Sequence, residues 1–318
     1  MATHSGRRIV EMVREKLIPS KIVTEKSMHN AITCYNLLGG STNAVIHLIA
    51  IAGRLGIKLP LEMFDTIGKV TPLIANLRPT GKYLMEDFFY AGGLPAMLSR
   101  VPDLLHGDVL TITGRTLAEN LAGVEVYNDD VIRTKETALF PDGGMAVLKG
   151  NLCPGGAVIK ANAGSPEMLT HTGPACVFKD YDDLTARVDD PDLVVTKDSV
   201  LILQNGGPVG GPGMPEWGMM AIPKKLLQAG VRDMVRISDS RMSGTSYGTC
   251  VLHVTPEAAI GGPLGLVKDG DMVRLDVPNR TLDMLVSDEE LAVRKAAWKP
   301  NLPAGDQHYG RKDTSNLQ

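Results

Sequence analysis

The stretch KDGDMVRLDVPNRTLDML (268–285) indicates most directly how the second part of the chain folds. Apolar and polar residues alternate in MVRLD and again in TLDM, as in strands that turn one face to a core. A DGD turn precedes the first run, and Pro-Asn-Arg separates the two runs. The stretch therefore predicts consecutive β-hairpins.

Short apolar runs separated by Gly, Pro or Asp turns continue this pattern through the second part of the chain, which begins near residue 125. Strands this short and this closely spaced predict a sandwich or a barrel. The runs are MAVLKG (145–150), GAVIKA (156–161), ACVFKD (175–180), SVLILQN (199–205), DMVRIS (233–238) and CVLHVT (250–255).

The first part of the chain has a helical pattern instead. Apolar residues spaced three and four apart predict helices over 6–56, and a further tract over 83–101 is interrupted by Gly92 and Gly93. In that tract we expect Met85, Phe88 and Phe89 to face the core. A chain of 318 residues is long enough for two domains. We place a helical or α/β part over 1–125, a β-rich part over 126–300 and an irregular tail over 301–318.

Composition limits the class of function. The net charge is −3, hydrophobic residues make up 43% of the chain and charged residues 22%, so neither a nucleic-acid partner nor a membrane surface is expected. The N-terminus has no apolar signal core, which makes the cytoplasm the expected compartment. The four cysteines are scattered, without a C-x-x-C pair. We therefore interpret them as buried thiols.

Two loops contain candidate site residues on chemical grounds alone. GGSTN (39–43) precedes an apolar helix, so Ser41, Thr42 and Asn43 either cap that helix or bind an anion at its start. NGGPVGGPGMPE (205–216) lacks both G-x-G-x-x-G spacing and a P-loop Lys, which argues against a nucleotide site. Its glycines are expected to let the backbone pass close to other groups and present Glu216, which is either a hard-cation ligand or a turn acid.

The segment DSRMSGTSYGT (239–249) contains GTSYG, which fits the G-x-S-x-G pattern of a serine hydrolase with Ser246 as nucleophile. That pattern requires a helix after the serine, but YGTCVLHVTP is β-branched and poor helix material. The hydrolase interpretation is therefore a remote alternative. Glu86 and Asp87 in MEDFFY belong either to a solvated helix face or to a site.

Several motifs together resemble the dihydroxyacid and sugar-acid dehydratase family, whose best-known branches are dihydroxyacid dehydratase and 6-phosphogluconate dehydratase. The resemblance covers about residues 5–296. This stretch is similar to the C-terminal part of the family's longer chains. The motifs are GGSTNAVIHLIAIAG, GKYLMEDFFYAGG, GGMAVLKGNLCPGGAVIK, FKDYDDLTARVDDPDL, GGPGMPE, SDSRMSGTSYGT and HVTPEAAIGGPLGLVKDGD.

The resemblance implies an α/β fold, in which residues 1–125 form the C-terminal portion of the family's N-terminal α/β domain and residues 126–300 form a β-barrel domain. It also implies a hydro-lyase that converts a 2,3-dihydroxy acid to a 2-keto-3-deoxy acid and water. The family's cofactors are an iron–sulfur cluster, of the 2Fe-2S or 4Fe-4S type, and Mg²⁺. Full-length members are expected to be homodimers or homotetramers whose partner is a small sugar acid.

Residue by residue, the resemblance makes Ser243 the base that removes the C2 proton, Thr245 its hydrogen-bonding neighbour and Glu216 a Mg²⁺ ligand. It implies weaker substrate-lining roles for Ser41, Thr42, Asn43, Glu86 and Asp87. None of the four cysteines stands in a cluster motif, so no cluster ligand and only a partial Mg²⁺ site are expected in this chain.

The segment MPEWGMMAIPKKLLQAGVRDMVRISDSRMSGT (214–245) is closer to sugar-acid dehydratases, such as L-arabinonate dehydratase, than to the branched-chain biosynthetic enzyme. We therefore expect a pentonate-type substrate. Two alternatives stay open: a dihydroxyacid dehydratase, and a non-catalytic remnant that acts as a scaffold. By itself, a chain without the cluster-binding half is expected to be inactive.

Overall fold

The computed structural model describes residues 2–243 and 247–300, which group into two compact units. The first unit comprises residues 1–40 and 44–144, and the second comprises 41–43 and 145–318. The sequence places the boundary at 125/126, whereas the units divide at 144/145. No helix among the described residues is long and apolar enough to span a membrane.

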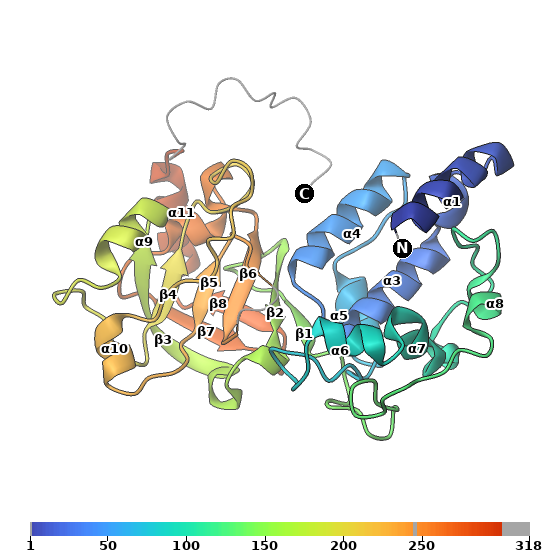
Figure 1. The fold of residues 1–318 in the computed structure, drawn as a ribbon. Helices are drawn as coiled ribbons and strands as arrows, with labels where there is room; N and C mark the ends of the chain where they lie inside the picture. Colours follow the sequence, from blue (N-terminus) through green and yellow to red (C-terminus); the bar gives the residue numbers. More distant parts are fainter. Residues whose placement is uncertain (1, 244–246, 301–318) are drawn as a thin grey trace. The chain divides into compact units, whose positions relative to one another are not determined.

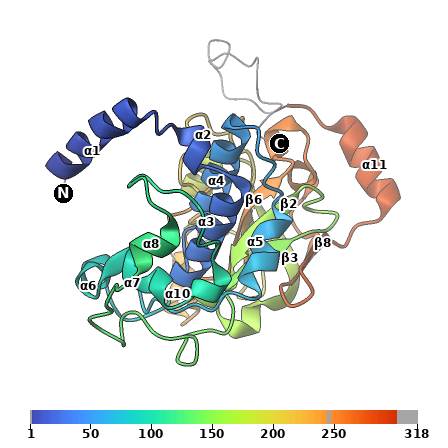
Figure 2. The same ribbon diagram turned by 90° about the vertical axis from the view of Figure 1, so that its right-hand side faces the viewer.

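The described residues of the first unit form helices and isolated β-bridges (Figure 1). Thr24 begins α3 with a capping box, and Gly39 ends it in the left-handed conformation at φ 63°, which glycine adopts without a steric penalty. Within this unit α3 packs against α5, and α7 packs against α6 and α8 (Figure 2). The helices are α1 (Ala2–Glu15), α2 (Pro19–Ile22), α3 (Glu25–Leu38), α4 (Asn43–Arg54), α5 (Glu62–Gly68), α6 (Met85–Tyr90), α7 (Gly93–Ser99) and α8 (Leu117–Leu121), with a 3₁₀ turn at Pro102–Leu104.

The helix prediction over 83–101 was correct in its break and wrong in part of its core. Gly92 lies between α6 and α7 at φ 112°. Phe88 is buried, but Met85 and Phe89 are 59% and 60% exposed. The helix α6 spans only six residues. The neighbouring helix α7 covers only a narrow stripe of its surface, and Met85 and Phe89 lie outside that stripe.

The second unit contains an eight-stranded mixed sheet in the order β1-β2-β6-β5-β4-β3-β7-β8 (Figure 1). All eight predicted runs form strands. Pairs among β3, β4, β5 and β6 are parallel, and the remaining pairs are antiparallel. The strands are β1 (Met145–Leu148), β2 (Gly156–Lys160), β3 (Thr170–Phe178), β4 (Val200–Leu203), β5 (Arg236–Ser238), β6 (Cys250–Thr255), β7 (Met272–Asp276) and β8 (Thr281–Met284).

The sheet nearly closes into a barrel, because the residue after β1 reaches β8. The Lys149 N–H donates to the Arg280 carbonyl at 3.0 Å, and the Leu282 N–H donates to the Lys149 carbonyl at 2.9 Å. Outside the strands lie α9 (Tyr181–Arg187), α10 (Lys224–Gln228) and α11 (Asp288–Ala297), with 3₁₀ turns at Ala161–Ala163, Pro166–Met168, Ala258–Ile260 and Pro263–Leu266. The predicted α/β class with a C-terminal barrel is thus confirmed.

The stretch 268–285 forms one hairpin rather than two. In β7 and β8 the buried residues alternate with more exposed ones, so Val273 and Leu275 lie in the core. They pair with Met284 and Leu282 in an antiparallel register. The other neighbour of β7 is β3, about 100 residues earlier in the chain. The DGD turn therefore leads into β7 without closing a hairpin of its own.

Candidate active site

The candidate site lies where the parallel strands β4 and β5 end. Leu203 pairs with Ser238, so both strands finish at the same edge of the sheet. The glycine-rich loop (residues 205–216) follows β4, and the serine segment (residues 239–243) follows β5. Because neighbouring parallel strands run in the same direction, the two segments emerge side by side.

Hydrogen bonds join the two segments on both sides of Glu216. Ser240 Oγ donates to the Pro215 carbonyl at 3.2 Å. The Gly218 N–H donates to the Arg241 carbonyl at 2.8 Å. Glu216 is thereby fixed beside the segment that ends in Ser243.

The Glu216 carboxylate is held by an amide and a guanidinium within the second unit. Asn43 Nδ2 donates to Glu216 Oε1 at 2.7 Å, and Arg241 Nε lies 3.6 Å from the same oxygen. Arg241 Nε also donates to Asn43 Oδ1 at 3.2 Å. The Glu216 side chain is 44% exposed, so it remains accessible to a cation in solution, as a hard-metal ligand must be.

The residues around Asn43 form a turn at the start of α4. Ser41 Oγ accepts the Asn43 N–H at 3.2 Å, and Thr42 is buried. Of the three GGSTN candidates, Asn43 reaches Glu216 through its side-chain amide, while Ser41 shapes the turn. Nothing in the structure assigns an anion to this helix start.

Ser243 lies two residues beyond Arg241 and is half-buried. Thr245 and Ser246 lie outside the described residues. After them the chain enters β6 at Cys250, so the helix that a hydrolase nucleophile elbow requires is replaced by a strand. This context argues against a nucleophile elbow at Ser246, and the role of Ser243 as a base remains a prediction.

Glu86 and Asp87 belong to the first unit. Asp87 Oδ2 accepts the Leu84 N–H at 2.8 Å, which caps the start of α6. Glu86 is exposed on the same helix. The structure thus gives Asp87 a capping contact, and substrate-lining roles for both residues remain predictions.

Two buried carboxylates that sequence reasoning missed lie beneath the glycine-rich loop. Asp239 is 3% exposed and accepts the N–H groups of Gly206 and Ala258, each at 2.8 Å. Glu257 is 9% exposed and accepts the N–H groups of Val209 at 3.0 Å and Gly210 at 3.1 Å. Burial, with a contribution from nearby Glu257, raises the pKa of Asp239 to about 7. Burial also raises the pKa of Glu257.

The glycines of this loop are needed because its backbone passes against these carboxylates. A Cβ on Gly207 would lie 2.4 Å from Glu257 Oε2, and one on Gly206 would lie 2.8 Å from Ser240 Cβ. The predicted close approach of the loop is therefore correct, and the groups that it approaches are side chains of the second unit.

Gly207→Ala is expected to destabilise the second unit by about 1–3 kcal/mol, because the added methyl group would force the loop away from Glu257. Denaturant unfolding monitored by tryptophan fluorescence measures the change, since Trp217 and Trp298 both lie in this unit. The control is Gly53→Ala in α4, where a Cβ meets nothing within 4 Å; because α4 lies outside the unit that contains the tryptophans, far-ultraviolet circular dichroism follows the unfolding of both variants. There alanine should stabilise the helix by about 0.5–1 kcal/mol. Equal effects of the two substitutions would contradict this account of the loop.

A buried ion pair fixes the chain just before β6. Arg236 is 2% exposed and donates to Asp233 Oδ1 at 3.1 Å, the Tyr247 carbonyl at 3.2 Å and the Met220 carbonyl at 3.1 Å. Asp233 also accepts the Thr249 hydroxyl at 2.7 Å. The chain at Tyr247 and Thr249 is thereby fixed to Asp233 and Arg236.

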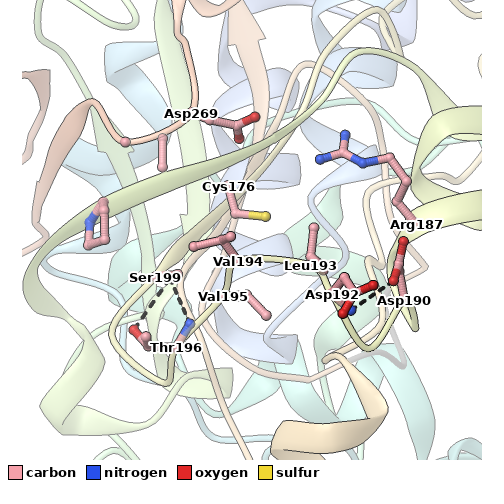
Figure 3. A pocket seen from close by; sticks show the side chains of 13 residues that line it. Cys176, Arg187, Asp190, Asp192, Leu193, Val194, Val195, Thr196, Ser199 and Asp269 are labelled. Atoms are coloured by element: carbon pink, nitrogen blue, oxygen red, sulfur yellow. Dashed lines mark hydrogen bonds between the residues drawn. The ribbon is translucent and has the colours of Figure 1, made fainter.

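A separate cavity of about 410 Å³ lies beside β3 and α9 (Figure 3). It is lined by Cys176, Arg187 and Asp269, but by none of the predicted site residues. Burial raises the pKa of the Cys176 thiol to about 11. Asp269 accepts the Val177 N–H at 2.6 Å, and Arg187 donates to the Val177 carbonyl at 3.1 Å. Both charged groups thus hold the backbone of β3 at Val177.

The cysteines do not fit an iron–sulfur cluster, which thiolates bind. Cys153, Cys176 and Cys250 are buried and Cys34 is half-buried, and burial raises the thiol pKa values to about 11 or 12. Within residues 2–243 and 247–300, no group of three His, Cys, Asp or Glu side chains could hold a metal ion. The role of Glu216 as a Mg²⁺ ligand therefore remains a prediction, for which the structure shows one carboxylate beside an amide and a guanidinium.

Comparison with known proteins identifies two family models along the chain. Residues 1–120 match the model described as dihydroxy-acid/6-phosphogluconate dehydratase N-terminal, and residues 130–317 match the corresponding C-terminal model. The prediction of similarity to the C-terminal part only was therefore too narrow.

Curated relatives extend well beyond this chain. L-arabinonate dehydratase of Rhizobium leguminosarum is 54% identical over 95% of the chain and 52% of its own length. The 6-deoxy-6-sulfo-D-gluconate dehydratase of Pseudomonas putida is 50% identical over 98% and 54%. Dihydroxy-acid dehydratase of Methanosarcina barkeri is 44% identical over 94% and 54%. The chain thus spans about half the length of the curated relatives it matches.

Proposed function

Because the chain belongs to the dihydroxy-acid/6-phosphogluconate dehydratase family, we propose that the whole protein is a hydro-lyase acting on a pentonate-type sugar acid. It removes the C2 proton and the C3 hydroxyl of a 2,3-dihydroxy acid, and the resulting enol becomes a 2-keto-3-deoxy acid. The observation that supports this most is the placement of Glu216 beside the segment that ends in Ser243.

The C2 proton lies next to a carboxylate and is weakly acidic, so its removal needs a positioned base. We assign this role to Ser243, with Thr245 as its neighbour. An unperturbed serine hydroxyl is too basic for this task, and it requires nearby positive charge to ionise. Arg241 is a permanent cation two residues away.

Glu216 is the ligand that this chain offers to Mg²⁺, and its amide and guanidinium neighbours fix the direction of its carboxylate. A bound Mg²⁺ supplies charge that stabilises the enediolate formed when C2 loses its proton. The cysteines of this chain do not fit an iron–sulfur cluster. We therefore assign the loss of the C3 hydroxyl to no residue of this chain.

The pentonate assignment rests on two relatives named for L-arabinonate and L-arabonate, at 54% and 50% identity. A relative named for 6-deoxy-6-sulfo-D-gluconate, a six-carbon acid, is 50% identical and supports a sugar acid more broadly. Dihydroxy-acid dehydratases, at 43–44% identity, support the second candidate. The test uses a reconstituted enzyme, defined here as this chain co-produced with the first half of the Rhizobium L-arabinonate dehydratase as a separate polypeptide.

The reconstituted enzyme should form keto acid from L-arabinonate about tenfold or more faster than from 2,3-dihydroxy-3-methylbutanoate. Semicarbazone absorbance measures the keto acid, and the chain alone should form none. The reverse preference would identify a dihydroxyacid dehydratase. Absence of product from both acids, with a soluble and metal-loaded complex, would favour a non-catalytic protein.

Glu216→Gln should raise the Mg²⁺ concentration for half-maximal activity of the reconstituted enzyme. Loss of a residue that only hydrogen-bonds a metal ligand lowers metal affinity about 10- to 100-fold. Loss of the ligand itself should lower the affinity at least as much. The control is Glu167→Gln, an exposed carboxylate near Met168 in the same unit. An unchanged Mg²⁺ dependence in Glu216→Gln would refute the ligand assignment.

A further inference from the structure

We propose that Asp239 and Glu257 are positioning residues that hold the glycine-rich loop, and with it Glu216, in register with the serine segment. Their effect on catalysis rests on the proposed function, whereas their effect on the loop does not. Neither side chain is assigned to substrate or metal.

The two carboxylates connect three segments that follow neighbouring parallel strands. Asp239 follows β5, and its two oxygens accept one N–H from the start of the loop at Gly206 and one from Ala258 beyond β6. Glu257 follows β6 and accepts the N–H groups of Val209 and Gly210 in the middle of the loop. Four backbone N–H groups thus converge on two side chains.

The backbone N–H groups of the loop need hydrogen-bond acceptors, which the two carboxylates provide. The N–H groups of Gly206 and Gly210 are buried, and a buried donor without a partner costs free energy. A carboxylate offers two oxygens that both accept, whereas an amide replaces one acceptor with a donor. Alanine at either position would remove both acceptors, and an amide would retain one.

The loop transmits this restraint to Glu216 and Trp217. Beyond Gly210 the chain is fixed again where Ser240 Oγ donates to the Pro215 carbonyl. The Trp217 ring then stacks on the Tyr181 ring, with centroids 4.9 Å apart and planes 9° apart. A loop released at Asp239 or Glu257 is expected to move Trp217 off this stack.

Trp217 therefore reports the loop without any substrate or cofactor. The other tryptophan, Trp298, follows α11 near Gly261, and Trp298→Phe leaves a single reporter in the complete chain. In this background, Asp239→Ala and Glu257→Ala should increase acrylamide quenching of Trp217 about twofold, as expected for local opening. Asp239→Asn and Glu257→Gln should fall between these values and wild type.

The matched control is Asp271→Ala, which removes the contact of this carboxylate with Arg294 at 3.0 Å and destabilises the same unit away from the loop. It should leave Trp217 quenching unchanged. In the reconstituted enzyme the alanine variants should lower kcat about 10- to 100-fold, as for a misplaced catalytic group. KM should change little, and the amide variants should partly restore kcat.

If the wild-type complex forms no keto acid, that result counts against the proposed function alone. The quenching of Trp217 still tests the positioning role of Asp239 and Glu257 in that case. Wild-type quenching in folded Asp239→Ala and Glu257→Ala variants would overturn the proposal. If the alanine variants fail to fold, the amide variants decide it in the same way, because they preserve volume. Increased quenching in Asp271→Ala to the same extent would also overturn it.

Discussion

Ser243→Ala in the reconstituted enzyme is expected to lower kcat for L-arabinonate by about 10²- to 10⁴-fold, the usual contribution of a positioned acid or base. Ser243 ends the segment that follows β5, two residues beyond Arg241, whose Nε lies 3.6 Å from Glu216 Oε1. The substitution removes one hydroxyl and keeps the hydrogen bonds that Ser240 and Arg241 make to the glycine-rich loop and to Gly218, so the fold and the Mg²⁺ dependence should persist.

Ser246→Ala provides the control for this prediction. The hydrolase pattern selects Ser246, but the chain enters the strand β6 rather than a helix a few residues later. Ser246→Ala should retain activity within about threefold of wild type, because a hydroxyl without a role in the reaction contributes little. The assignment would be reversed by an active Ser243→Ala variant together with an inactive Ser246→Ala variant.

The largest stability effect is expected for Asp233→Ala. Arg236 is almost fully buried, and Asp233 is its carboxylate partner at 3.1 Å. Removing one member of a buried pair leaves an uncompensated charge, which costs about 3–5 kcal/mol. Asp233 also accepts both the N–H and the hydroxyl of Thr249, so the chain just before β6 should loosen as well.

Chemical denaturation at pH 7 followed by tryptophan fluorescence measures this loss. Asp198→Ala is the control, because its pair with Lys197 is exposed and such pairs contribute about 1 kcal/mol or less. Similar losses in both variants would contradict the importance of the buried pair.

The Asp233 contribution should also depend on pH. Burial alone raises the pKa of Asp233, but hydrogen bonds from Ser165 and Thr249 and the charge of Arg236 outweigh burial and lower it. A lowered carboxyl pKa gives stability that is present above the unfolded-state value and lost as the pH falls through the folded-state value. The difference between wild type and Asp233→Ala should therefore shrink in acid, below about pH 4.

Local sequence patterns were sufficient to locate the strands, because each strand is a short apolar run whose pattern reflects burial. They were not sufficient to pair them. Alternation in 268–285 correctly predicts that Val273 and Leu275 face the core, but the pairing of β7 with β3 depends on contacts about 100 residues apart. Likewise, Met85 and Phe89 share a helical spacing with Phe88, yet only Phe88 is covered.

Family motifs single out Ser243 and Glu216, and the structure brings their two segments together, while the roles of both residues remain predictions. Asp239 and Glu257 were missed because they stand 18 positions apart and neither lies in a metal or nucleotide pattern. The sequence indicated these two carboxylates only indirectly. A glycine-rich loop without a phosphate-binding motif must need its glycines for some other close contact of its backbone. The backbone N–H groups that meet the two carboxylates supply that reason.

The central claim is that Ser243 takes the C2 proton of a sugar acid. The most direct test follows L-arabinonate deuterated at C2 and measures, by nuclear magnetic resonance, the release of its deuterium into water by the reconstituted enzyme. Wild type should release deuterium in step with keto acid, and Ser243→Ala should release it about 10² times more slowly or less. A Ser243→Ala enzyme that still exchanges the C2 position at the wild-type rate, while failing to form keto acid, would show that another group is the base.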